Sequence, residues 1–181
     1  MVKTFIYWLV AIGFTAAATT SFAAKQQVQQ SPEKFMGSWD RNAGIVSLFV
    51  KEIDHIKQAR MVVADEYIEN ARSKLSFTLT LSDLDDFGDM LDNALEDLID
   101  AEKRPVPELR TPESAENVGQ LIYPNGIFVF NTVSPAGTQK YTTMVVTSLL
   151  RKDTFVFWME KADLKTFKKL ITKTQNELSE Q

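Results

Sequence analysis

The stretch LSFTLTLSDLDDFGDML, Leu75–Leu91, decides the fold because the spacing of its apolar residues changes partway along it. Apolar and polar residues alternate from Leu75 to Leu81, which is the period of a strand with one buried face. From Ser82 onward the apolar residues recur at intervals of three and four, which predicts an amphipathic helix. The sequence therefore predicts a strand that passes directly into a helix, with Ser82 as the cap of that helix.

A second stretch, FVFWMEKADLKTFKKLI, has the same pattern over Phe155–Ile171, eighty positions later. The residues that coincide at this shift are Phe77 with Phe157, Leu79 with Met159, Leu84 with Leu164 and Phe87 with Phe167. This similarity indicates an internal repeat. The alternative is a chance likeness between two ordinary junctions of a strand and a helix, since periodic apolar patterns recur easily.

The predicted fold is α+β, with two β-β-β-α repeats over 35–102 and 119–181 and a proline-containing linker over 103–118. Each repeat consists of antiparallel strands followed by one helix, and Phe35–Trp39 and Gly119–Tyr123 are candidates for a short leading strand. One such repeat would leave a sheet face and a helix stripe poorly covered. We therefore expect the two repeats to pack around a pseudo-two-fold axis as one domain.

The N-terminus predicts export. Residues 1–23 combine a positive start at Lys3, an apolar run and small residues before a cleavage point after Ala23, as in a signal peptide. The alternative is an uncleaved anchor, but the apolar run is too short to span a bilayer and no second such run follows. We expect a periplasmic or secreted protein of bacterial type, without a membrane span after cleavage and with a flexible leader over 24–34.

Composition restricts the function. Removing the first 23 of 181 residues leaves 158, and the loss of Lys3 changes the formal net charge from −4 to −5. A chain of this length buries enough surface to fold without disulfide bonds, which agrees with the absence of cysteine. An acidic chain is poorly suited to the phosphate backbone of a nucleic acid, because that binding depends on Lys and Arg.

The tandem repeat of antiparallel strands and a helix, with each helix opening on an acidic residue, a Leu and then a Phe, resembles the PUR repeat and the wider Whirly-type fold. The stretches that carry this resemblance are Phe77–Leu91 and Phe157–Ile171. The resemblance implies binding of single-stranded DNA or RNA on a sheet face through basic and aromatic residues. Trp158 lies on the polar side of its strand, where a base could stack, whereas its counterpart Thr78 could not do so.

The sequence contains no motif of a metal site, a cofactor site or a catalytic site. The acidic run at 83–88 departs from the EF-hand pattern, because Phe87 and Ala94 occupy positions that need oxygen ligands. His55 is the only histidine and lies in a predicted turn, where a surface role is expected. We therefore predict a protein that is not an enzyme and has no cofactor.

The two predicted helices differ in charge. Between Asp83 and Glu102 the first helix carries only acidic residues among its charged residues, whereas the second carries lysines at four-residue intervals. This contrast predicts a docking surface or a head-to-tail contact between molecules. The alternative is two solvated helix faces, because exposed charge pairs contribute little. The candidate binding residues are Trp158, Lys161, Lys165, Lys169 and Lys173.

From these patterns we expect a non-enzymatic binding or adaptor protein of the bacterial cell envelope that engages a protein partner. One alternative is binding of single-stranded nucleic acid through the sheet face, as the resemblance implies. A second is a small hydrolase with a pair of carboxylates, which the 24 acidic residues allow but do not locate. A homodimer is compatible with each of these functions.

Overall fold

The computed structural model describes residues 32–41, 44–65, 73–105, 114–135, 139–151 and 153–180. The signal peptide predicted over 1–23 and most of the leader predicted over 24–34 lie outside these residues. Among the helices of the described segments, neither is apolar enough over a sufficient length to cross a membrane.

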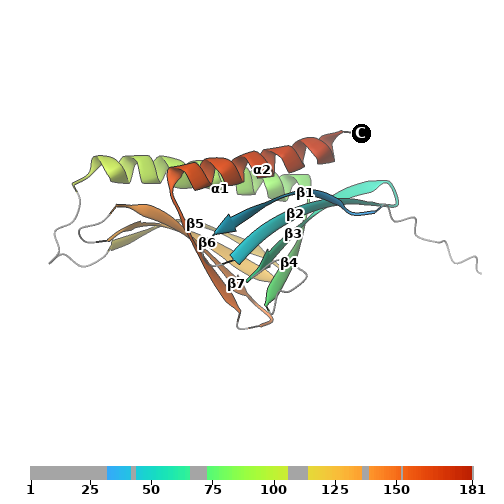
Figure 1. Ribbon diagram of the computed structural model, residues 1–181, viewed down its shortest axis with the longest axis horizontal. Helices are drawn as coiled ribbons and strands as arrows, with labels where there is room; N and C mark the ends of the chain where they lie inside the picture. The colour runs from blue at the N-terminus through green and yellow to red at the C-terminus, as the bar shows by residue number, and fades with distance from the viewer. Residues whose placement is uncertain are drawn as a thin grey trace, which may run out of the picture.

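The chain forms two β-β-β-β-α units, which confirms the predicted α+β class with one helix after each set of antiparallel strands (Figure 1). The first unit consists of β1 (Lys34–Arg41), β2 (Gly44–Ile53), β3 (Ile56–Ala64), β4 (Lys74–Leu79) and α1 (Leu81–Lys103). The second consists of β5 (Ser114–Tyr123), β6 (Gly126–Ser134), β7 (Tyr141–Ser148), β8 (Thr154–Met159) and α2 (Lys161–Ser179). Within each unit the four strands pair in sequence order, and we call β1–β4 sheet 1 and β5–β8 sheet 2.

The leading strand of each unit is longer than the sequence predicts. β5 begins at Ser114, inside the segment 103–118 that was predicted as a linker, and pairs with β6 along its whole length. A β-bulge between Asn117 and Gly119 interrupts its register, and most of its residues are partly or fully exposed. The strand therefore lacks the regular alternation of apolar and polar residues by which strands are recognised.

The first helix begins at Leu81, and its cap is Thr80 rather than the predicted Ser82. The Asp83 backbone N–H donates to the Thr80 hydroxyl at 3.2 Å, and the Thr80 backbone N–H donates to the Asp83 carboxylate at 2.7 Å. This reciprocal pair is a capping box, which needs a spacing of three residues between cap and carboxylate. Ser82 has an acid at the same spacing, Asp85, but it lies inside the helix, and the Asp85 carboxylate accepts a hydrogen bond from Gln175 of α2 instead.

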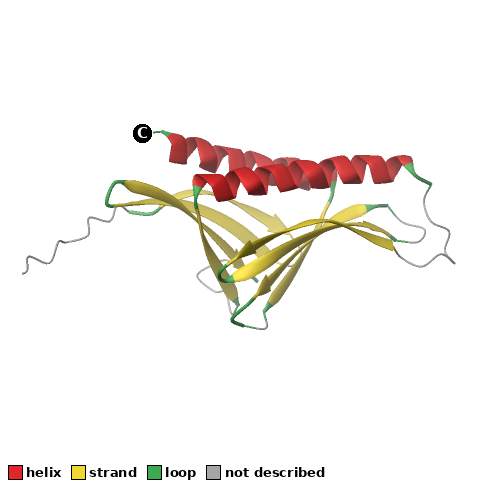
Figure 2. Cartoon of the chain, turned by 180° about the vertical axis from the view of Figure 1, so that it is seen from behind, coloured by secondary structure: helices red, strands yellow, loops and turns green. Residues whose placement is uncertain are grey.

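Each helix packs on the sheet of the opposite unit. Both helices lie side by side on one side of the sheets (Figures 1 and 2). α1 lies mainly against β5 and β6, while α2 lies mainly against β1 and β2. Two equivalent glycines show how close this packing is, because a Cβ on Gly37 would meet Leu170 at 2.9 Å and one on Gly119 would meet Met90 at 2.7 Å. The two units are therefore interleaved, since neither covers its own sheet with its own helix.

Aromatic rings fill the core between the units. Phe87 of α1 contacts Phe128 of β6 and Phe167 of α2 in edge-to-face pairs with centroid distances of 5.2 and 5.5 Å. On its other side Phe167 stacks on Trp39 of β1, with centroids 5.1 Å apart and an interplanar angle of 10°. All of these rings are buried, and each contributes about 2 kcal/mol through its removal from water.

A lysine of the opposite unit donates hydrogen bonds to the C-terminal end of each helix. Lys140, which is buried, donates to the Ala101 carbonyl and, at 2.9 Å, to the Arg104 carbonyl at the end of α1. Its counterpart Lys57 of β3 donates to the Glu177 carbonyl at 3.1 Å near the end of α2. A cation at this position binds carbonyls of the last helical turn and opposes the negative end of the helix dipole.

Two buried threonines face each other on the inner side of sheet 2. Thr132 and Thr142 are paired across β6 and β7, and neither hydroxyl has a hydrogen-bond partner among the described residues. The equivalent pair in sheet 1 is Val50 and Ala59. Because the apolar pair fits the same place in the first unit, the hydroxyls are not required by the packing.

We expect Lys140→Met to lower the free energy of unfolding by about 2 kcal/mol, because it removes a charged donor from buried carbonyls at the end of α1. Lys57→Met should cost less, about 1 kcal/mol, because this ammonium group is nearer to solvent. Urea unfolding of the chain from residue 24 onward measures both changes. Equal stability of wild type and Lys140→Met would contradict the capping role.

We expect Thr132→Val to raise the free energy of unfolding by about 1 kcal/mol, because it removes an unpaired buried hydroxyl with almost no change of shape. The matched control is the reverse substitution in the first unit, Val50→Thr, which should lower stability by a similar amount. Thermal and urea unfolding of both variants provide the measurement. A loss of stability in Thr132→Val would show that its hydroxyl has a structural role.

Candidate functional site

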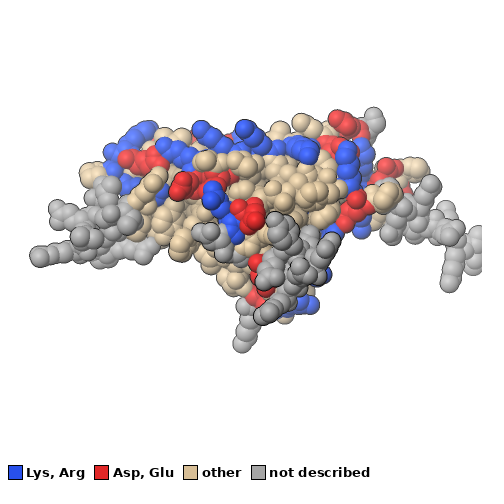
Figure 3. Space-filling model, in the orientation of Figure 1, with Lys and Arg blue, Asp and Glu red and all other residues tan. Residues whose placement is uncertain are grey.

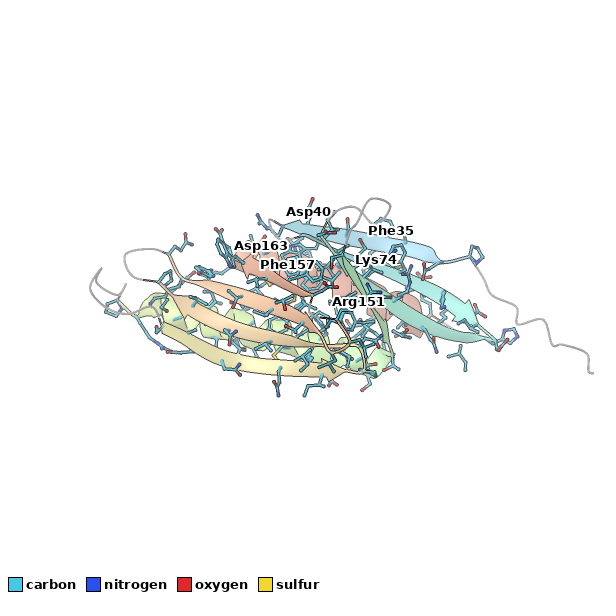
Figure 4. All side chains as sticks on the ribbon, turned by 90° about the horizontal axis from the view of Figure 1, so that it is seen from below. Phe35, Asp40, Lys74, Arg151, Phe157 and Asp163 are labelled. Atoms are coloured by element: carbon cyan, nitrogen blue, oxygen red, sulfur yellow. The ribbon has the colours of Figure 1, made fainter. Side chains whose placement is uncertain are left out.

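The two sheets present their outer faces on the side opposite the helices. Figure 4 shows this side, with the strands in front of the helices. Alternation along the strands directs residues such as Phe157 into the core and their neighbours, such as Val156 and Trp158, outward. The outer faces of the two sheets carry different side chains.

The outer face of sheet 2 has no charged side chain along its described strands. Its outward positions follow from the pairing of β5, β6, β7 and β8, and they hold aliphatic, aromatic, threonine and amide side chains. The large apolar members exposed on this face are Ile122, Val156 and Trp158. Exposed apolar surface of this kind marks contact sites in soluble proteins.

One row of residues across each sheet shows the contrast between the units. In sheet 2 the row contains Asn117, Asn131, Thr143 and Trp158, one from each strand. In sheet 1 the equivalent row contains Phe35, Phe49, Arg60 and Thr78. The aromatic residues thus lie at opposite ends of the two rows, and only the row of sheet 1 carries a cation.

Trp158 is the centre of the candidate site. Its side chain is 60% exposed although it belongs to a six-residue strand whose alternate residues are fully buried. The ring of Tyr141, from the neighbouring strand, lies beside it with a centroid distance of 5.8 Å and an interplanar angle of 36°. The two rings form an aromatic platform that a partner can cover at a small entropic cost, since both side chains have few rotatable bonds.

Arg60, the cation in the row of sheet 1, is already engaged. Arg60 lies over the Phe49 ring, with its guanidinium carbon 4.7 Å from the centroid, and its Nε donates to the Glu33 carboxylate at 2.6 Å. This hydrogen bond is the main reason why the pKa of Glu33 is lowered and the pKa of Arg60 is raised. Arg60 is therefore held by an acid and a ring of its own sheet.

The predicted binding residues fall on two surfaces. Trp158 lies on the outer face of sheet 2, whereas Lys165, Lys169 and Lys173 lie on α2, which packs on the other side of the strands. Lys161 forms an ion pair with Glu102 of α1. The structure therefore does not unite the tryptophan and the lysines in one site.

The lysines of α2 line a groove between this helix and β1, with a volume of about 660 Å³. Lys34, Met36 and Glu177 complete part of its wall, and Lys34 forms an ion pair with Glu177. Figure 3 shows a row of Lys and Arg side chains along the helix side of the molecule. This basic surface is separate from the aromatic platform.

Sequence reasoning identified Trp158 but not the uncharged face around it. The missed residues include Tyr141, Val156 and Ile122, which alternate with core residues along their strands. The available signal was the lack of charged residues at these outward positions, which is unusual for a sheet face in contact with water. His55 lies in the tight two-residue turn between β2 and β3, as expected for a surface residue.

No protein-family model matches this chain, and no curated protein shows significant sequence similarity to it. The resemblance to PUR and Whirly-type proteins therefore stays a prediction from the order of strands and helices.

We expect Glu33→Gln to lower the free energy of unfolding by about 0.5 kcal/mol at neutral pH. Arg60 keeps the pKa of Glu33 below its ordinary value of 4.5, so this contribution is present above pH 4.5 and is lost as the pH falls through the lowered pKa. Urea unfolding of both chains from neutral to acid pH provides the measurement. A difference between the two chains that does not shrink in acid would contradict this account.

Proposed function

We propose that this chain is an exported, non-enzymatic binding protein of the bacterial cell envelope that engages a protein partner through the outer face of sheet 2. The observation that carries the proposal is the absence of charge from the outward positions of the described strands β5–β8, together with exposed Trp158, Val156 and Ile122. Apolar and aromatic residues without charge form the centre of most protein interfaces.

The alternative is single-stranded nucleic-acid binding on the same face, which the resemblance to PUR and Whirly-type folds implies. The pair of rings at Trp158 and Tyr141 favours it, because successive bases stack on such platforms. The outward positions of the described strands β5–β8 carry no Lys or Arg, which opposes it, because affinity for nucleic acid comes mainly from cations at phosphates. The overall acidic charge of the chain also opposes it.

The test is site-specific crosslinking in living cells. A photoreactive benzoylphenylalanine replaces Trp158 in one protein and its equivalent Thr78, on the outer face of sheet 1, in the matched control. Both positions are exposed, and both lie on six-residue strands. A difference in crosslinking between them therefore reflects which sheet face the partner contacts, and not how exposed the probe is. Adding Val156→Lys, or its counterpart Ser76→Lys, tests which face the partner covers.

We expect a discrete crosslinked protein with the probe at position 158, no such product with the probe at position 78, and resistance of the product to nuclease. Val156→Lys should abolish this product, because it places an unpaired charge in the interface, and Ser76→Lys should leave it unchanged. A nuclease-sensitive product at position 158 would instead support the nucleic-acid alternative. Equal crosslinking from both positions would contradict the proposed face.

A further inference from the structure

The two helices form a layer whose outer surface faces away from both sheets (Figures 1 and 2). They run antiparallel and are tied along their shared side by contacts between Asp92 and Lys168 and between Glu102 and Lys161. Gln175 also donates to Asp85 across the same boundary at 2.8 Å. These contacts fix the helices beside each other but use only part of their charge.

The outer surfaces of the helices are opposite in charge at equivalent positions. Lys165 and Lys169 of α2 correspond to Asp85 and Asp89 of α1, eighty positions earlier. All four side chains are exposed, while the residues between them in the helix stripe are buried in both units. The fold therefore accepts either sign at these positions, so packing does not explain why one helix is basic and the other acidic.

Several of these charges have no partner within the described part of the chain. Lys165 and Lys169 form no ion pair there, and neither do Asp89 and Glu96 on the other helix. Lys165 and Lys169 are four residues apart and repel each other, and so do Asp85 and Asp89 at the same spacing on α1. An oppositely charged surface with the same spacing would relieve both repulsions.

We propose that the outer face of the helix layer binds the same face of a second copy of this chain. A two-fold axis parallel to the helices places α1 of each copy over α2 of the other, so that acidic and basic rows meet twice. Because Asp92 is level with Lys168 in each copy, Lys165 lies within about 2 Å along the axis of Glu96 of the other copy, and Lys169 within about 3 Å of Asp89. A two-fold axis across the helices would place like charges together instead, so the charge pattern selects one closed dimer.

The size of the face sets the strength of the dimer. A layer about 30 Å long and about 20 Å wide, from the rise and spacing of two packed helices, offers about 600 Å² on each copy. This lies at the lower limit of specific interfaces, and its contacts are mainly between charges. The association should therefore be reversible, with a dissociation constant on the order of micromolar or weaker, and sensitive to salt.

Charge reversal on each helix provides the test. One variant carries Lys165→Glu and Lys169→Glu, which reverses these outward charges of α2, and the other carries Asp89→Lys and Glu96→Lys, which reverses these outward charges of α1. Sedimentation velocity of the mature chain measures the dimer at about 0.02 M and about 0.5 M salt, where the screening length differs several-fold. The matched controls are Lys74→Glu and Trp158→Thr on the outer faces of the sheets.

We expect the wild-type protein to dimerise at low salt, with an association constant at least about tenfold lower at high salt. Each reversed variant alone should be monomeric, an equimolar mixture of the two should restore the dimer, and both controls should dimerise like wild type. A wild type that is monomeric at low salt, reversed variants that still dimerise, or a mixture that stays monomeric would overturn the proposal. Loss of the dimer in Trp158→Thr alone would assign association to sheet 2 and would overturn it as well.

Discussion

The apolar stripe of each helix is buried against the sheet of the opposite unit, and the rest of the structure depends on this reciprocal packing of the helices. Phe87 of α1 reaches β6, while Phe167 of α2 stacks on Trp39 of β1. At the helix ends, Lys57 donates a hydrogen bond to α2 and Lys140 donates one to the end of α1, in each case from the opposite unit. Separation of the units would expose both stripes and both inner sheet faces at once. The units should therefore fold and unfold together.

Local patterns made much of this fold predictable. The change of period after Leu81 and its recurrence eighty residues later gave the β4–α1 and β8–α2 junctions, since both depend on neighbouring residues alone. The full length of β5 was not predictable, because a bulge and exposure on both sides remove the alternation. The packing of each helix on the sheet of the opposite unit was also not predictable, because the same apolar stripe fits either sheet. Lys140 gave no local signal, since its partners are backbone carbonyls about 36 to 39 residues away.

The repeated architecture separates what the fold requires from what it does not. Equivalent core positions keep their character, as in Phe77 and Phe157 or Leu84 and Leu164. Equivalent surface positions diverge, as in Thr78 and Trp158. Exposed positions that differ while their buried neighbours agree are free to serve binding. Trp158 could be chosen from the sequence because alternation places it on the polar side of its strand. The sequence could not place the lysines of α2 on a different side of the molecule, because that requires the tertiary arrangement.

Native-state hydrogen exchange in increasing urea tests the interleaving of the units most directly. The amides of β2 and β6, central strands of the two sheets, are the positions to compare. If each sheet depends on the helix of the other unit, both sets of amides should exchange through one opening with the same free energy and the same dependence on urea. Exchange of one sheet through an opening of lower free energy, while the other sheet stays protected, would contradict this account.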